Sequence, residues 1–409
     1  MGRLNSLESR YGATNYRPLP VTVVRGEGAY VWDEDGRRYL DLLGAYSSAS
    51  FGHCHPRLVA AMTQQAKRLD TISRAYFTDR LGPFLARACE LTGMEAALPA
   101  NGGAESVETA IKAARKWAYT VKGVPRDRAE IIAAEGNFHG RSTTIVGFST
   151  VAQYRDGFGP FAPGFKLVPF GDVAALEAAI TPNTAAFLIE PIQGEGGINV
   201  PPAGYLAEAA RVCRERGVLL ICDEIQTGLG RTGRLLACQH DGVTPDGVIL
   251  GKALGGGLIP VSLFLARRNL MQVFKPGDHG STFGGNPIAA AVGLAALDIL
   301  VEERLVERAA ALGARLLSRL SALDNPLIRE VRGRGLLAGI ELDATRIRAA
   351  IVVEKLLSVG ILTKEAHRNT LRLAPPFVIT EAEIDWAVDQ IAGVLAALCK
   401  DIVEPVTAP

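Results

Sequence analysis

An aspartate and a lysine each follow a short apolar run, and this arrangement is the first sign of chemistry in the chain. Residues 218–222 (VLLIC) lead into Asp223, and residues 248–251 (VILG) lead into Lys252. Such runs are typical of strands buried on both faces of a parallel sheet, and ligands bind at the carboxyl ends of these strands. A buried lysine bordered by glycines suits a Schiff-base role, because burial favours the neutral, nucleophilic amine. The structural alternative is that Asp223 caps a helix and Lys252 extends into solvent.

The glycine pattern at residues 228–233 (GLGRTG) resembles a dinucleotide-binding fingerprint without its context. That fingerprint needs its first glycine at a strand end, a helix that opens at the glycines, and an acid about 20 residues later. Here residues 223–227 (DEIQT) separate the predicted strand from the glycines, and residues 231–234 (RTGR) are typical of a loop. We therefore do not expect a nicotinamide site.

Two further glycine-bordered stretches carry groups that a phosphorylated ring would need. Gly102 and Gly103 precede a predicted helix at 106–122, and backbone N–H groups at a helix N-terminus bind phosphate. In the GNFHGR stretch at 136–141, Phe138 could stack on a flat ring and Arg141 could bind a carboxylate. The alternatives are a plain glycine N-cap, a core phenylalanine and a solvated arginine. Together with the lysine and the aspartate, these groups match the needs of pyridoxal phosphate.

Composition indicates an ordinary globular protein and excludes several classes of partner. Hydrophobic residues make up 48% of the 409 residues, and the formal net charge of +1 argues against nucleic-acid or acidic-membrane partners. No apolar run has the length of a membrane span, and no signal or transit segment is recognised. The six cysteines are scattered, as is typical of reduced thiols, so we expect a cytoplasmic protein. The HCH triplet at 53–55 has no companion cluster at zinc spacing, so we expect no metal.

The order of predicted elements indicates an α/β fold. Strands and helices alternate from about residue 95 to 265, which predicts a mostly parallel central sheet flanked by helices. An antiparallel meander is predicted at 21–42, and a helix, short strands and a final helix follow residue 303. The length suggests two domains. We predict a large cofactor-binding domain at 46–300 and a smaller α+β domain that combines 1–45 with 301–409.

The DEIQTGLGRTG stretch at 223–233, followed by GKALGGG at 251–257, resembles the fold-type I pyridoxal-phosphate aminotransferases of the class III group. The resemblance extends from NYRP at 15–18 to the proline pair at 375–376. Within the group it is strongest to the branch that acts on the δ-amine of ornithine. It implies transfer of that amine to 2-oxoglutarate, with glutamate 5-semialdehyde and glutamate as products.

The resemblance implies how the cofactor ring is held. Lys252 would form the Schiff base and later move the substrate proton, and Asp223 would keep the pyridine nitrogen protonated. Gln226 would hydrogen-bond the 3-oxygen of the ring, and Phe138 would stack on the ring face.

The resemblance also implies that the phosphate site spans two subunits. Gly103 and Ala104 would donate backbone N–H groups to the phosphate, and Ser281 and Thr282 would complete the site across the interface of a homodimer. Neither subunit would then have a complete site alone.

Five further residues are implied to let two differently charged substrates share the site. Arg141 would bind the carboxylate remote from the reacting amine, Tyr16 would hydrogen-bond the α-amino group, and Tyr46 would shape the pocket. Glu195 would pair with Arg372 while ornithine is bound, and would move aside when Arg372 binds the α-carboxylate of 2-oxoglutarate. An uncovered Arg372 would bind ornithine by its α-carboxylate, and the wrong amine would react.

Other activities on the same cofactor stay open. Acetylornithine aminotransferases typically carry small or aliphatic residues at the positions of Tyr16 and Tyr46, so the two tyrosines favour free ornithine. His139 instead resembles the acetylornithine branch, and residues 364–369 (KEAHRN) have no assigned consequence. Lysine ε- and 4-aminobutyrate aminotransferases are further alternatives. A mutase or racemase would not need a switch that admits a second oxoacid.

Overall fold

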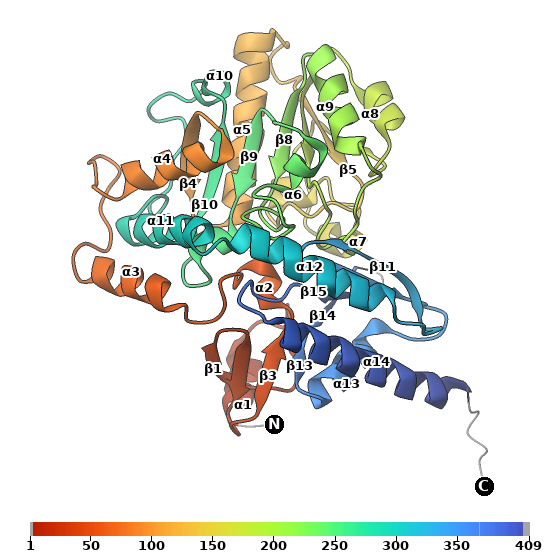
Figure 1. Cartoon of the computed structure of the whole chain (residues 1–409). Coiled ribbons are helices and arrows are strands. Elements are labelled where there is room, and N and C mark those ends of the chain that lie inside the picture. The colour runs from red at the N-terminus through yellow and green to blue at the C-terminus, as the bar shows by residue number, and fades with distance from the viewer. Residues whose placement is uncertain (1–2, 368, 404–409) are drawn as a thin grey trace.

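A seven-stranded sheet forms the centre of the larger part of the molecule (Figure 1). The computed structural model describes residues 3–367 and 369–403. The strands β9, β8, β7, β5 and β6 are parallel, whereas β10 is antiparallel to its neighbours β9 and β4. The mostly parallel α/β sheet predicted from the sequence is therefore confirmed. In sheet order the strands are β4 (Ala96–Ala100), β10 (Ser262–Ala266), β9 (Gly247–Leu250), β8 (Leu219–Asp223), β7 (Thr184–Ile189), β5 (Glu130–Ala134) and β6 (Phe165–Val168).

Both faces of this sheet are buried, which explains the uninterrupted apolar runs of its strands. Leu220 and Cys222 of β8 belong to one hydrophobic cluster, whereas Leu219 and Ile221 belong to another. This alternation follows from the two-residue period of a strand. Helix α9 (Tyr205–Glu215) contributes to the first cluster and α5 (Gly103–Trp117) to the second.

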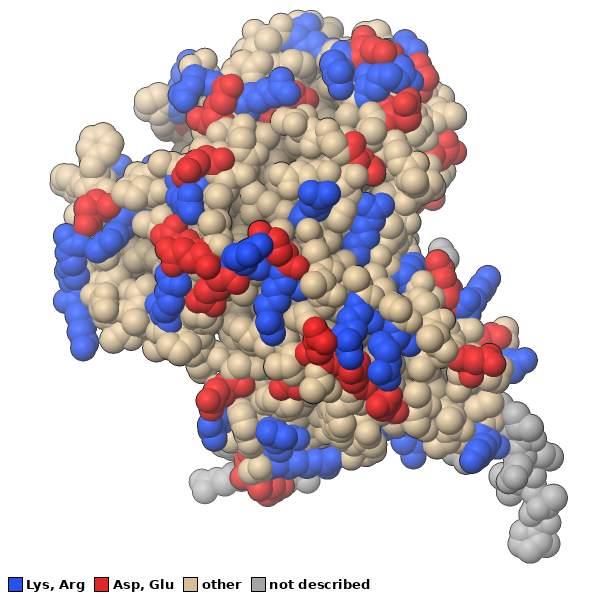
Figure 2. All heavy atoms as spheres, in the orientation of Figure 1, with Lys and Arg blue, Asp and Glu red and all other residues tan. Residues whose placement is uncertain are grey.

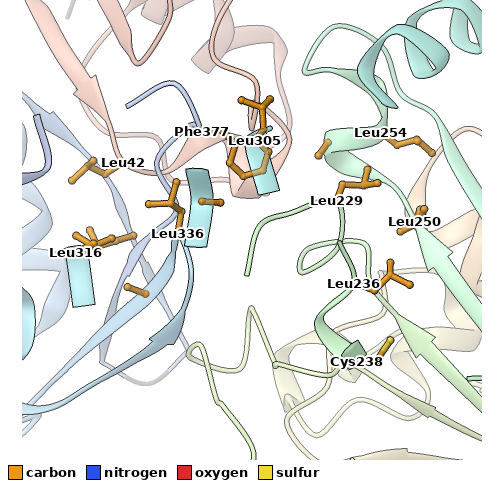
Figure 3. Packing of buried hydrophobic residues seen from close by; sticks show 14 of the residues in the cluster. Leu42, Leu229, Leu236, Cys238, Leu250, Leu254, Leu305, Leu316, Leu336 and Phe377 are labelled. Atoms are coloured by element: carbon orange, nitrogen blue, oxygen red, sulfur yellow. The ribbon is translucent and has the colours of Figure 1, made fainter. Parts of the chain in front are cut away.

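The first cluster extends beyond the large sheet into the C-terminal part of the chain (Figure 3). It runs from Leu250 of β9, through Leu229 and Leu236, to Leu336 and Phe377. The elements on both sides therefore share one continuous core.

The remaining α-helices surround the three sheets. They are α1 (Arg3–Tyr11), α2 (Gly44–Ser47), α3 (Pro56–Ala66), α4 (Leu81–Thr92), α6 (Thr143–Val146), α7 (Ala152–Arg155), α8 (Val173–Ala179), α10 (Arg268–Met271), α11 (Pro287–Glu302), α12 (Leu305–Ser321), α13 (Ala349–Ser358) and α14 (Glu381–Val403). A π-helix, η1 (Ala118–Lys122), extends α5, and two 3₁₀-helices are η2 (Ala237–Asp241) and η3 (Lys252–Gly255).

Two smaller sheets contain the outer parts of the chain. The first has the order β1 (Val23–Glu27), β2 (Tyr30–Asp33), β3 (Arg38–Asp41) and β13 (Ile361–Leu362). Its parallel β3–β13 pair joins N-terminal and C-terminal segments, which lie together at the bottom of the view (Figure 1). The second has the order β11 (Ile328–Arg334), β12 (Leu337–Leu342), β15 (Thr370–Leu373) and β14 (Lys364–Ala366). The domain boundaries at 45/46 and 300/301 stay a prediction.

Several predicted elements differ from the structure. Helix α5 begins at Gly103 instead of residue 106, because the extended N-cap Gly102 lets the first turn start at the glycine pair, and its last predicted turn is the π-helix η1. Strand β4 was not predicted, since its alanines and proline give no β-branched signal. Strand β11 was missed because three of its seven residues are arginines, which hide the apolar alternation.

On the face shown in Figure 2, Lys and Arg are interspersed with Asp and Glu, with no extended area of one sign. Within the described part of the chain, no helix combines the length and apolar character needed to cross a membrane.

Candidate active site

Asp223 and Lys252 lie at one edge of the large sheet, as the apolar runs predict. Asp223 is the last residue of β8, and Lys252 comes two residues after the end of the neighbouring parallel strand β9. Both line a cavity of about 200 Å³. Lys252 has a φ of 45°, an uncommon backbone conformation that is over-represented at functional sites. Burial lowers the pKa of the Lys252 amine to about 8, so a neutral, nucleophilic amine is accessible near physiological pH.

His139 also lines the cavity and contacts the carboxylate of Asp223. Its Nδ1 lies 2.7 Å from Oδ2 of Asp223, and its side chain is fully buried. Burial lowers the pKa of His139, but the hydrogen bond to Asp223 and the charge of that carboxylate outweigh this effect, so the pKa is raised overall. The sequence marked His139 only as a difference between family branches, and its contact with Asp223 is a result of the fold.

Glu190 is a fourth ionisable group at the same cavity, and the sequence predicts no role for it. It follows β7 and accepts hydrogen bonds from the backbone N–H groups of Phe138 (2.8 Å) and Gly194 (3.2 Å). Burial raises its pKa to about 7. Its position after a buried strand is the signal that identified Asp223, and it could have been found in the same way.

The first turn of α5 closes another side of the cavity. Gly103 and Ala104 line the cavity, and the N-cap Gly102 makes no side-chain hydrogen bond to the turn. A Cβ atom on Gly103 would lie 2.8 Å from Cδ1 of Ile225, so any other residue here would require the Ile225 side chain to shift. The turn therefore presents a helix N-terminus, which favours an anion such as phosphate.

Ser281 and Thr282 lie outside the wall of this cavity. Both are exposed, and Oγ of Ser281 accepts a hydrogen bond of 2.9 Å from Nδ2 of Asn101. Asn101 lines a second cavity of about 340 Å³, which Gly103 and Lys252 also border. Within its own chain, Ser281 therefore bonds to a residue that borders this second cavity.

Arg372 and Glu195 form a bidentate ion pair beside the cavity. Nη2 of Arg372 donates to Oε2 of Glu195 at 3.0 Å, and Nη1 donates to Oε1. The Arg372 side chain is only 1% exposed. Burial raises the pKa of Glu195, but its bonds to Arg372 outweigh burial and lower the pKa overall, so the carboxylate is charged. Arg372 is therefore covered by Glu195, as the resemblance implied.

Tyr46 contacts this ion pair from a strained turn. Its ring lies 4.9 Å from Cζ of Arg372, in a cation–π contact. Gly44, Ala45, Tyr46 and Ser47 have φ values of 55°, 46°, 59° and 75°, so this one-turn α2 is left-handed. That conformation costs about 1–2 kcal/mol for each non-glycine residue. Such strain is found mainly where surrounding structure supports a functional geometry.

Arg141 and Tyr16 do not line the cavity. Arg141 is exposed next to Phe138, with Cζ 5.7 Å from the Phe138 ring and 4.1 Å from the Tyr154 ring. Among the described residues it has no hydrogen-bond or ion-pair partner. The Tyr16 side chain is 77% exposed, and it is near enough to contribute to the raised pKa of Tyr46, which burial dominates.

The structure thus brings most of the predicted cofactor residues to one wall and arranges the substrate residues around it. The predicted site residues that line the cavity are Gly103, Ala104, Phe138, Glu195, Asp223, Gln226 and Lys252, and the rest of the lining is formed by His139, Gly140, Glu190, Ile225 and Thr227. Within the described residues, no group of three or more His, Cys, Asp or Glu side chains has the arrangement of a metal site.

Comparison with known proteins identifies the family. The model of the family "Aminotransferase class-III" matches residues 11–395 of the chain. This chain belongs to the class III aminotransferases. It is 54% identical over 390 residues to the ornithine aminotransferase of Bacillus cereus (strain Q1), with 95% of this chain and 98% of that protein covered.

Solved structures of the family have the same fold. An ornithine aminotransferase from Toxoplasma gondii, described with partial occupancy of pyridoxal phosphate at its active site, superposes with a TM-score of 0.96 at 47% identity. That alignment covers 98% of this chain and 95% of the other. An acetylornithine aminotransferase from Elizabethkingia anophelis superposes with a TM-score of 0.88 at 45% identity, covering 96% of this chain and 98% of that one.

Class III aminotransferases use pyridoxal phosphate, and the residues of the cavity fit this cofactor. Gln226 lines the cavity, so its side-chain amide is available to hydrogen-bond the 3-oxygen of the ring. Lys252 offers an amine, Asp223 a carboxylate for the ring nitrogen, and the α5 turn a phosphate site. When bound, pyridoxal phosphate supplies an aldehyde that condenses with amines and a ring that accepts electrons from a broken C–H bond.

Proposed function

We propose that this protein is an ornithine δ-aminotransferase, which transfers the terminal amine of L-ornithine to 2-oxoglutarate. The products are glutamate 5-semialdehyde and glutamate. The observation that carries the proposal is the contrast between two arginines beside the site: Arg372 is covered by Glu195, whereas Arg141 is uncovered. The names of the relatives support the same activity.

This contrast sets the direction in which ornithine binds. Ornithine has one carboxylate and two amines, and its carboxylate seeks an unpaired cation. Arg141 is unpaired, whereas binding to Arg372 would first require breaking a buried ion pair. The carboxylate therefore binds at Arg141, and the amine at the other end of the substrate is the one presented to Lys252.

The second substrate, 2-oxoglutarate, requires Arg372 to be free of Glu195. 2-Oxoglutarate carries two carboxylates, so two cations are needed. Arg141 binds the remote carboxylate, and Glu195 moves aside so that Arg372 binds the carboxylate next to the reacting carbon. Glu195 is only partly buried, with 25% of its side chain exposed, and this leaves room for the movement.

The residues around the reacting atoms divide the proton chemistry among them. Lys252 takes up and returns the substrate proton at Nζ, and its lowered pKa of about 8 suits both directions near neutral pH. With the cofactor bound, Asp223 would hold a proton on its ring nitrogen, and His139 orients the aspartate through its Nδ1 contact. Gln226, which lines the cavity, would orient the ring by a hydrogen bond from its side-chain amide to the 3-oxygen.

We also propose that the active form is a homodimer in which Ser281 and Thr282 reach the partner's phosphate site. Large aromatic side chains project from this chain: Phe77 is fully exposed, Tyr76 is 65% exposed, and Phe283 beside Thr282 is 56% exposed. Exposed aromatic residues are typical of protein interfaces. Light scattering coupled to size-exclusion chromatography should show a mass of twice the chain mass of 43.4 kDa.

The test of the activity is a comparison of amine donors on purified protein. Ornithine, acetylornithine, lysine and 4-aminobutyrate are each offered with 2-oxoglutarate, and glutamate is measured. The cyclised semialdehyde from ornithine is measured separately as its adduct with 2-aminobenzaldehyde. Ornithine should have the highest kcat/KM. A higher value for acetylornithine would overturn the proposed donor and would assign this chain the activity of its acetylornithine relative.

A further inference from the structure

The uncovered Arg141 makes cation–π contacts with two aromatic rings, and the ring of Tyr154 is the nearer one. Cζ of Arg141 lies 4.1 Å from the centre of the Tyr154 ring, closer than its 5.7 Å distance to the Phe138 ring. The Tyr154 and Phe138 rings meet edge to face, with centres 6.1 Å apart and planes at 77°. The guanidinium is therefore held against two aromatic rings that also contact each other.

This cluster is anchored to the cofactor cavity. Phe138 lines the cavity, and its backbone N–H donates to the buried Glu190 at 2.8 Å. Tyr154 lies in α7, and the next residue, Arg155, stacks on Phe161 with Cζ 5.5 Å from the ring. Tyr154 thus links the long, exposed side chain of Arg141 to Phe138, which forms part of the cavity wall.

An arginine that stacks on an aromatic ring is well suited to bind a carboxylate. An arginine loses about 2 kcal/mol of rotamer entropy when it is ordered, and a partner that orders it in advance reduces the cost of binding. A ring face contacts the guanidinium through its flat side and leaves the N–H groups in the plane free for a bidentate carboxylate. An acidic partner would have occupied these donors, as Glu195 does at Arg372.

We propose that Tyr154 is a positioning residue that orders Arg141 for the carboxylate of the amine donor, and thereby selects donors that carry a carboxylate over plain diamines. This inference rests on the proposed function, because it assigns to Arg141 the role of carboxylate receptor. Tyr154 itself touches the arginine and not the reacting atoms.

The test combines two donors with two substitutions. Ornithine is compared with 1,4-diaminobutane, which has the same amine chain without the carboxylate. Tyr154→Leu should raise KM for ornithine about two- to fivefold, the range of an exposed cation–π contact, with a smaller change in kcat. KM for 1,4-diaminobutane should stay within twofold. Tyr154→Phe keeps the ring and should restore the KM for ornithine, and Gln153→Leu on the same helix is the matched control.

A double-mutant cycle separates this role from a general disturbance of the fold. If Tyr154 acts through Arg141, Tyr154→Leu should have no further effect on KM in an Arg141→Leu background. Additive effects, or equal losses with both donors, would overturn the proposal. Turnover of ornithine by the unsubstituted protein tests the proposed function separately. If acetylornithine is the better donor, that function fails, and the same cycle with acetylornithine still decides the role of Tyr154.

Discussion

Replacement of Glu195 by glutamine should make the enzyme lose its choice between the two ends of ornithine. The substitution keeps the size of the side chain but removes the charge that covers Arg372. Arg372 is 1% exposed and bonds to Glu195 through both Nη atoms. In the Glu195→Gln variant it would therefore be a buried cation without an anionic partner. The substrate's α-carboxylate is the anion that can reach it.

The magnitude follows from the bonds that are exchanged. A hydrogen bond to a charged group contributes about 1.5–3 kcal/mol, and 1.4 kcal/mol corresponds to about tenfold in affinity. In the proposed mechanism, glutamate and 2-oxoglutarate displace Glu195 from Arg372, and in the Glu195→Gln variant this cost is largely removed. KM for glutamate should therefore fall, and the ratio of α- to δ-transamination of ornithine should rise by about 10- to 100-fold.

The assay measures both quantities on one preparation. NMR distinguishes the two cyclised products of ornithine, which differ in the position of the carboxylate relative to the ring imine, and steady-state kinetics gives KM for glutamate. Glu365→Gln is the matched control, because Glu365 pairs with Lys364 and lies near Tyr46 but makes no bond to Arg372. If Glu195→Gln forms only the δ-product with an unchanged KM for glutamate, the ion pair does not control the direction of binding.

Three other perturbations test separate parts of the structure. The pKa of Lys252 is lowered to about 8, so the fraction of neutral amine increases with pH up to that value. The rate at which the apoprotein takes up pyridoxal phosphate, followed by absorbance, should therefore increase about tenfold per pH unit below pH 8 and then level off. The Lys252→Ala variant should show no such pH profile. Tyr46→Ile removes the ring over Arg372 and should shift kcat/KM from ornithine towards acetylornithine or 4-aminobutyrate, whereas an unchanged ratio would show that Tyr46 does not shape the pocket. Arg231→Met should lower the free energy of unfolding in urea by about 3 kcal/mol or more, because it leaves three buried acceptors unpaired, the carbonyl oxygens of Leu336 and Pro375 and Oγ of Ser50. As a control, Arg234→Met at an exposed position should change the free energy of unfolding by less than about 0.5 kcal/mol.

The case of Arg231 shows why a local glycine pattern is weak evidence. Residues 228–233 are predicted to form a loop and no nucleotide site, and the structure confirms the loop, with φ of 89° at Gly230 and 83° at Gly233. The sequence does not indicate that Arg231 is fully buried and donates to the carbonyl oxygens of Leu336 and Pro375. Those partners are 105 and 144 residues away, and no local pattern encodes them.

The sequence by itself determined the parts of the site that depend on strand ends and helix starts. Uninterrupted apolar runs predict strands buried on two faces, and parallel strands must end at one edge of their sheet, so Asp223 and Lys252 had to come together. The glycine pair before α5 predicts an anion site for the same reason, since a helix N-terminus leaves its N–H groups unpaired.

Only the tertiary structure decided which charges are paired and which are free. Glu195 and Arg372 are 177 residues apart, and His139 and Asp223 are 84 residues apart. Each pair comes from loops or strands that meet only when the sheets assemble. The contrast between the covered Arg372 and the ring-stacked Arg141 follows from this packing. A side chain's charge is set by its residue type, but its partner, and therefore its availability to a substrate, is set by the surfaces that the fold brings into contact.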